Sequence, residues 1–204
     1  MTTTDPIFDL DAGIVCLDFV NTLSSTSGEH LNTYFDLLAF AQQSALLTQA
    51  EADRLRAHAL RSPGAADTVV QHARVLRTTL RQIFGAIAAD ERPHDGDVDH
   101  LNHELALAMK HACLELRGDG FAWQWTGEEL ERPLWPIARS AADLLTSDSV
   151  RRLVRECGAS DCRWLFLDSS KNRTRQWCSM SSCGNREKAR RHYQRQKARR
   201  AQSA

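Results

Sequence analysis

Across the first 110 residues, apolar side chains recur every three or four positions, which is the spacing of an amphipathic helix. The strongest stripe predicts a long helix from about Asp67 to Ala89, after a break at Ser62-Pro63-Gly64. Its apolar positions are Val69, Ala73, Leu76, Leu80, Ile83 and Ile87. Shorter helices are expected over residues 14–23 and 35–46, from a capping box at Thr48 to about Leu60, and over residues 98–109. A short strand is expected at residues 7–11 and a loop at residues 24–29.

From residue 112 onward the hydrophobic period changes from 3.6 to 2. Phe121, Trp123 and Trp125 alternate with polar residues, and Gly118-Asp119-Gly120 supplies a tight turn. The pattern predicts a β-hairpin over residues 112–126, with its tryptophans in packing contacts rather than stacked on bases. A helix should follow from Pro133 to residue 145, and a short one over residues 149–155.

The C-terminal part of the chain has a third pattern. Residues 164–168 predict a strand, residues 169–172 a turn, and residues 174–178 a returning strand. From Cys183 onward the sequence is helical in character and strongly basic. Ala189, Tyr193 and Gln196 lie along one side of this helix, so we expect them to pack against the hairpin formed by the two strands.

The overall composition is that of an ordinary globular protein. The 204 residues are 42% hydrophobic and 25% charged, enough for one good-sized domain and a small module. No stretch approaches the roughly 18 consecutive apolar residues of a membrane span, so no membrane partner is expected. The first twelve residues contain three Asp and no Lys or Arg, unlike a secretory signal. These features favour a cytoplasmic protein.

The formal net charge of zero hides a strong asymmetry. Residues 1–150 carry 11 Lys and Arg against 22 Asp and Glu, whereas residues 151–204 carry 15 against 4. Such a division indicates that the basic segment binds a polyanion while the acidic segment has another task. The alternative is that the two segments neutralise each other within the fold.

Four cysteines stand out in the basic segment: Cys157, Cys162, Cys178 and Cys183. They form two C-x4-C pairs separated by fifteen residues, the arrangement in which a hairpin-sized insert brings two short loops to one point. Four thiolates satisfy a tetrahedral Zn²⁺ with no open position, so we expect one structural zinc ion. Two disulfides, or four unrelated cysteines, are the alternatives; a reducing compartment argues against disulfides.

The residues around these cysteines carry a resemblance. Cys183-Gly184-Asn185-Arg186, together with Asp161-Cys162 and Trp177-Cys178-Ser179-Met180, closely resembles the bacterial CGNR zinc-finger family. Near the other end, Cys16-Leu17-Asp18-Phe19-Val20-Asn21-Thr22 is similar to the opening motif of the helical ABATE domain that precedes this finger. The resemblance covers nearly the whole chain. It implies a transcription regulator, linked to stress, whose zinc module binds nucleic acid.

The expected fold class is therefore mainly α (α+β). An acidic helical domain with one β-hairpin should occupy residues 1–147, followed at residues 148–204 by a small treble-clef-like zinc finger with a basic C-terminal helix. Since no long flexible linker separates them, the two parts should pack together. Because so small a module has little core, zinc should supply much of its folding free energy. A Cys178→Ser change should then unfold the finger and spare the helical domain.

Arginine and lysine side chains of the finger are the candidate nucleic-acid contacts, since guanidinium and ammonium groups suit phosphates and guanine edges. The residues are Lys171, Arg173, Arg175, Arg186, Lys188, Arg190, Arg191 and Arg195. Double-stranded DNA is favoured over RNA as the partner. Asn185 is expected to be structural, capping the helix or donating to a thiolate.

Asp18 and Asn21 are the polar residues of an apolar run. They could form a ligand site, but buried polar groups are usually satisfied internally, which favours a hydrogen-bonded pair tying the N-terminus to a neighbouring loop. An enzyme with a site there is a weaker hypothesis, because no nucleophile elbow, phosphate-binding glycine loop or metal-binding helix accompanies it. A zinc-stabilised protein-interaction module is the other alternative. A homodimer and a small-molecule effector remain open.

Overall fold

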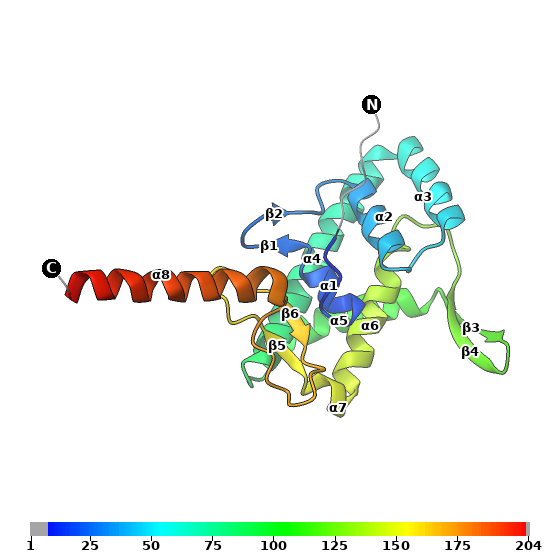
Figure 1. The fold of residues 1–204 in the computed structure, drawn as a ribbon. Helices are drawn as coiled ribbons and strands as arrows, with labels where there is room; N and C mark the ends of the chain where they lie inside the picture. The colour runs from blue at the N-terminus through cyan, green and yellow to red at the C-terminus, as the bar shows by residue number, and fades with distance from the viewer. Residues whose placement is uncertain (1–7, 203–204) are drawn as a thin grey trace.

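The computed structural model describes residues 8–202, with side-chain burial through residue 197. Its helical body is built around α4, a 26-residue helix that contacts four other helices, α1, α2, α3 and α5 (Figure 1). The helices of the body are α1 (Val15–Val20), α2 (Tyr34–Gln43), α3 (Gln49–Arg61), α4 (Pro63–Ala88), α5 (Asp95–Met109), α6 (Leu134–Thr146) and α7 (Asp148–Arg151). None of the described helices is long and apolar enough to cross a membrane.

Local sequence sets the helix starts. α2 and α3 begin with capping boxes in which Thr33 and Thr48 accept from the third helical N–H while Asp36 and Glu51 accept in return. Pro63 occupies the first position of α4, where its missing N–H costs nothing. The helix predicted to begin at the Thr48 capping box is confirmed. The long helix begins at Pro63, four residues before the predicted start at Asp67.

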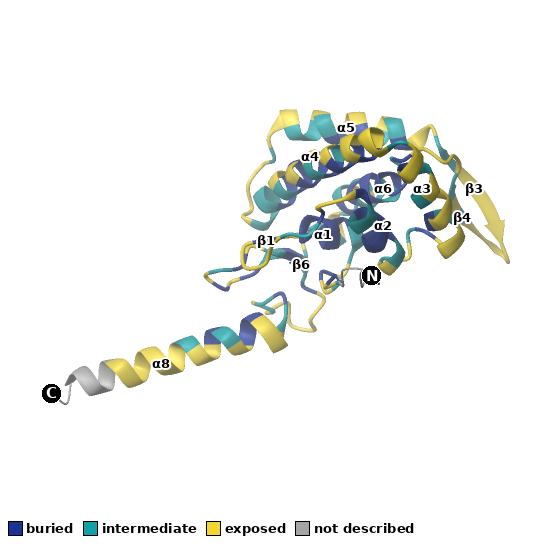
Figure 2. Cartoon of the chain, turned by 90° about the horizontal axis from the view of Figure 1, so that it is seen from above, coloured by how far each residue is buried: buried dark blue, intermediate teal, exposed yellow. Residues whose placement is uncertain are grey.

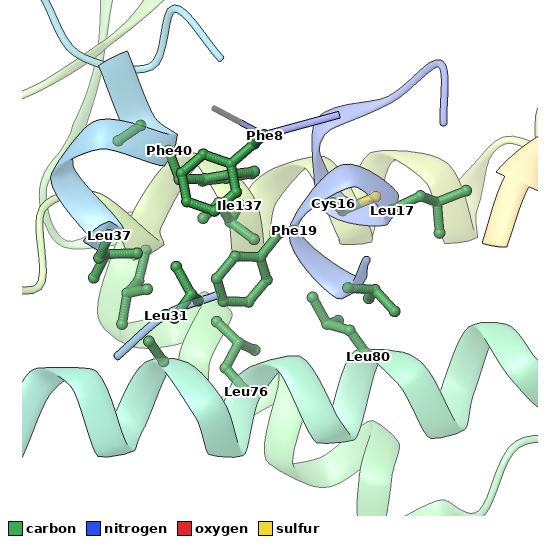
Figure 3. Close-up of a cluster of buried hydrophobic side chains, with 14 of the residues drawn as sticks. Phe8, Cys16, Leu17, Phe19, Leu31, Leu37, Phe40, Leu76, Leu80 and Ile137 are labelled. Carbon is green, nitrogen blue, oxygen red and sulfur yellow. The ribbon is translucent and has the colours of Figure 1, made fainter. Parts of the chain in front are cut away.

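The core lies where α1 crosses between α4 and α6 (Figure 3). Phe19 and Leu17 of α1 are fully buried, as are Leu76 and Leu80 of α4 and Ile137 of α6. A short helix with this many buried apolar side chains cannot form alone and is stabilised by its packing. α1 therefore depends on both neighbouring helices.

Three two-stranded antiparallel sheets complete the described fold. The pairs are β1 (Leu23–Ser24) with β2 (Gly28–Glu29), β3 (Ala112–Arg117) with β4 (Gly120–Trp125), and β5 (Val154–Glu156) with β6 (Leu165–Leu167). The β3–β4 hairpin confirms the period-2 pattern. The expected loop at residues 24–29 instead contains the small β1–β2 hairpin, and the described residues 8–11 of the expected first strand are not a strand.

The strands of the finger differ from the prediction in position. Helix α7 ends at Arg151, and Val154 and Arg155, predicted to be helical, belong instead to strand β5 (Val154–Glu156). Residues 174–178 are not a strand, because their backbone groups are occupied otherwise: Arg175 N–H donates to Asp168 and Gly158 N–H donates to the Gln176 carbonyl. The partner of β6 thus precedes the first cysteine instead of following the turn.

The β3–β4 hairpin projects from the helical body, and Figure 2 shows it largely exposed. At its base Trp125 is half-buried against Trp135, which confirms the packing expectation for that residue. Trp123 remains 41% exposed beneath the guanidinium of Arg139, and Phe121 near the tip is 73% exposed. Packing of the tryptophans is thus confined to the base of the hairpin.

The finger is docked on the helical body, as the absence of a linker predicted. Val154, Leu165 and Phe166 are fully buried and belong to the same apolar cluster as the helices of the body. The backbone N–H of Leu167 donates to the carbonyl of Ala12 at 2.8 Å. The two parts therefore share one hydrophobic core.

The last helix, α8 (Asn185–Gln202), leaves this body as a single projecting rod (Figures 1 and 2). The prediction that Ala189, Tyr193 and Gln196 pack against the finger strands is wrong: all three are exposed, Tyr193 to 69%. The reason is compositional, since α8 has no continuous apolar stripe with which to bury a face.

Candidate metal centre and basic helix

The four predicted zinc ligands converge at one point. Cys157 directly follows β5, Cys162 lies shortly before β6, Cys178 precedes the π-helical turn η1 (Met180–Gly184), and Cys183 lies within that turn. Their four sulfurs lie within 4.8 Å of one another, and all four side chains are largely buried. The geometry brings together residues up to 26 positions apart, as the spacing predicted.

The sulfur distances fit a metal and exclude disulfides. Cys178 Sγ lies 3.7 Å from Cys162 Sγ and 3.5 Å from Cys183 Sγ. A tetrahedron with Zn–S bonds of about 2.3 Å has edges of about 3.8 Å, whereas a disulfide needs about 2.0 Å. All six cysteines of the chain are free thiols. The protein therefore binds one structural Zn²⁺ through these four cysteines.

The electrostatics of the cysteine cluster favour a bound cation. Hydrogen bonds from the Cys162 and Cys178 thiols lower the pKa of Cys157, so one thiolate forms easily. Its hydrogen bonds in turn raise the pKa of Cys162 to about 12 and raise that of Cys178. One thiolate thus opposes the ionisation of its neighbours, and a bound dication would offset that opposition.

Neighbouring groups hold the ligands in place. Arg186 donates to Cys183 Sγ at 3.2 Å, and the Cys178 backbone N–H donates to Cys157 Sγ at 3.4 Å. Close packing explains why position 184 is a glycine. A Cβ there would lie 2.5 Å from Met180 Sδ and 3.1 Å from the Trp177 ring. Such N–H to sulfur bonds orient the thiolates around the metal.

The first turns of α8 are anchored to the loop between Cys157 and Cys162. Asp161 accepts from Arg186 at 2.9 Å and from Arg190 at 3.3 Å. Glu187, almost fully buried, accepts from Arg190 at 2.7 Å and from the Ser160 hydroxyl at 3.3 Å. The structure thus places Arg186 and Arg190 in a network that fixes the direction of α8.

Arg175 is the third candidate contact residue with an internal role. Its guanidinium lies 4.4 Å from the centre of the Phe166 ring and donates to the Trp177 and Cys178 carbonyls. These contacts use the donor groups that a phosphate would require. Of the predicted contact residues, Lys171, Arg173, Lys188, Arg191 and Arg195 are exposed.

Asn185 and the pair near the N-terminus have structural contacts. Asn185 is exposed and donates to the Ser181 carbonyl at 3.2 Å, which agrees with its expected structural role. Asn21 bonds both the N–H and the carbonyl of Leu165, at 3.0 and 2.9 Å. Asp18 accepts from the Ala12 N–H at 2.9 Å, and burial raises its pKa to about 6. Both side chains are thus satisfied internally, as expected, but each bonds a different segment and they do not form a pair with each other.

Comparison with known families agrees with this architecture. The ABATE model, described as "putative stress-induced transcription regulator", matches residues 13–148, and the CGNR zinc-finger model matches residues 153–196. The chain belongs to the ABATE family and carries a CGNR zinc finger. No curated protein matches it. The short interval between the two matches lies at α7, between α6 of the ABATE domain and β5 of the CGNR finger.

Sequence reasoning missed the acidic residues of the CGNR finger. Asp161 and Glu187 hold the basic helix, and Asp168, 1% exposed, bonds the Ser170 and Arg175 backbone N–H groups at 3.0 Å each. Two of these acids could have been singled out from the sequence. Asp161 directly precedes a zinc ligand, and Glu187 is an isolated acid in a basic run.

Proposed function

We propose that the protein is a bacterial transcription regulator whose CGNR finger presents α8 to nucleic acid, with double-stranded DNA favoured over RNA. The observation that carries the proposal is the projecting helix itself. Residues 191–197 of α8 are exposed and include Arg191, Arg195 and Lys197, and the one acidic residue of the helix, Glu187, is turned inward against Ser160. A free polycationic helix repels itself unless a polyanion is near.

The dimensions and the charge distribution suit a duplex. An 18-residue helix is about 27 Å long, and the DNA major groove, about 12 Å wide, admits one helix. The excess of acidic residues in the ABATE domain disfavours contact between the helical body and phosphates. The protein would therefore bind DNA with its finger toward the duplex and its ABATE domain away from it. In this proposal the ABATE domain receives an effector or a partner, and the protein acts in the cytoplasm and is not an enzyme.

Fluorescence anisotropy of the zinc-loaded full chain on labelled duplex DNA and RNA, across a salt series, tests the proposal. If about six phosphates are contacted, log K should fall against log salt with a slope of roughly −5. Lys188→Gln and Arg195→Gln should each reduce that slope by about 1, because both side chains are exposed and outside the Asp161 network.

Arg61→Gln, an exposed arginine at the end of α3, is the matched control and should leave affinity and slope unchanged. Absence of binding at low salt would contradict the proposal. It would favour the alternative in which α8 binds an acidic protein surface. Equal effects of Lys188→Gln and Arg61→Gln would show nonspecific attraction without a contact surface.

A further inference from the structure

A cavity of about 360 Å³ lies where the ABATE domain meets the CGNR finger. Its walls come from α1, the β1 hairpin and α4, which are labelled in Figure 1, and from Arg163, the residue that follows Cys162. Its polar lining includes Arg77, Arg81, Arg163, Asn21, Ser25 and Thr78. Each of these can donate a hydrogen bond, and among the described residues no carboxylate lines the cavity.

Arg77 is the fixed member of the three arginines. Its side chain is 4% exposed, and its two terminal nitrogens donate to the Glu29 carboxylate, with one of them also 3.0 Å from the Thr22 hydroxyl. The third nitrogen, Nε, is buried and has no hydrogen-bond partner in the described structure. A buried guanidinium N–H without an acceptor is costly, and a bound anion near it would reduce that cost.

Arg81 and Arg163 supply the more accessible charges. Arg81 donates to Glu156 at 2.7 Å and to the carbonyl of Arg163, which joins α4 to the finger. Arg163, which also lines the cavity, is 76% exposed and lies 3.5 Å from Glu156, so its ion pair with that carboxylate is weak. Two carboxylates thus accompany three guanidiniums, which leaves one positive charge in excess.

We propose that this cavity is a binding site for a small oxyanion, meaning a small molecule that carries a phosphate or carboxylate group. Guanidinium groups recognise such anions through parallel N–H bonds, and the volume lies at the small end of known ligand pockets. Val20 and Leu23 add an apolar wall for the remainder of the molecule.

The site also has a route to the finger. Arg163 directly follows the zinc ligand Cys162, and Asn21 holds Leu165 two residues later. An anion that draws Arg163 inward would change its pairing with Glu156 and shift the loop that carries Asp161, the anchor of α8. The regulatory part of this inference rests on the proposed function; the binding part does not.

Isothermal titration calorimetry of the zinc-loaded full chain with orthophosphate and with malonate, at constant ionic strength, tests binding. We expect saturable one-to-one binding of at least one probe. Arg163→Met should weaken it roughly tenfold or more, the value of a charge-assisted hydrogen bond. Ser25→Glu, which places a carboxylate at the exposed edge of the cavity, should weaken it similarly without removing any buried contact.

Arg61→Met removes the same charge far from the cavity and should bind the probes like the unmodified protein. Absence of saturable heat for both probes, or equal weakening by Arg61→Met and Arg163→Met, would overturn the inference. If neither probe binds but Arg163→Met lowers the DNA salt slope by about 1, the arginines contact the nucleic-acid backbone, which also overturns it. DNA binding by the same samples is scored separately, so either idea can fail while the other survives.

Discussion

A single amide, that of Asn21, forms two buried hydrogen bonds between the two parts of the chain. It accepts from the N–H of Leu165 and donates to the carbonyl of the same residue, both buried. This is what a neighbouring strand would do for Leu165, so the side chain replaces a strand at the edge of β6. Asn21 is therefore polar because its amide satisfies two buried backbone groups of Leu165.

Asn21→Ala should destabilise the protein by about 2–4 kcal/mol, because two buried backbone groups lose their partners. Urea unfolding followed by circular dichroism measures the change. Asn32→Ala is the control, since Asn32 is exposed and its amide bond to the Glu29 carbonyl can be replaced by water. A loss at Asn21 no larger than that at Asn32 would show that the contact contributes little.

Asp18 predicts a pH dependence. Burial raises its pKa from 3.8 to about 6, so the folded state disfavours the ionised carboxyl and its contribution to stability falls as pH rises between those values. Asp18→Asn keeps an acceptor for the Ala12 N–H and does not ionise. The variant should gain about 2–3 kcal/mol relative to the unmodified protein between pH 4 and pH 7. Urea unfolding at both pH values tests this, and a difference independent of pH would contradict it.

At the scale of elements, α8 is fixed at its start and unsupported thereafter. Arg186, Glu187 and Arg190 bind the Ser160–Asp161 segment, whereas residues 192–197 are all exposed. Deleting residues 192–204 should therefore leave the melting temperature unchanged within about 1 °C while lowering helical content. Thermal melting at 222 nm measures both.

Asp161→Ala, in contrast, should lower the melting temperature because it releases two arginines at once.

The elements that sequence predicted well are those with a long or chemically strict pattern. The stripe from Val69 to Ile87 specified α4, and strict alternation specified the β3–β4 hairpin. The cysteine spacing specified the metal centre because tetrahedral coordination permits few arrangements.

The elements that sequence missed are short and depend on distant partners. Strand β5 has three residues, too few for a period, and its strand form is set by pairing with β6 across the first cysteine pair. Likewise, residues 174–178 have a strand-like composition, but Asp168 and Gly158 occupy their backbone groups. The internal roles of Arg175, Arg186 and Arg190 were also hidden, since a list of charges does not say which are paired.

At the scale of the molecule, zinc should stabilise more than the finger. Leu165 and Phe166 lie between the cysteine pairs and are buried in the core of the ABATE domain. We therefore replace the expectation that Cys178→Ser spares the helical domain. Chelation of zinc, or Cys178→Ser, should lower the melting temperature of the whole chain in one transition.

Cys113→Ser is the control for this experiment, because Cys113 lies exposed on the β3–β4 hairpin outside the metal cluster. It should melt like the unmodified protein and retain its zinc. Two separate transitions after chelation, with the helical signal retained in the second, would show that the shared core does not couple the two parts.

The projecting helix has one more consequence, for the way such a protein can change over generations. Residues 192–197 of α8 are all exposed, so we expect substitutions there to leave the packing of the body undisturbed. If α8 binds nucleic acid as proposed, these positions form a set separate from the residues that keep the chain folded. Under the proposed function, mutation can therefore change the binding specificity of α8 one exposed position at a time, while the chain stays above the stability that folding requires.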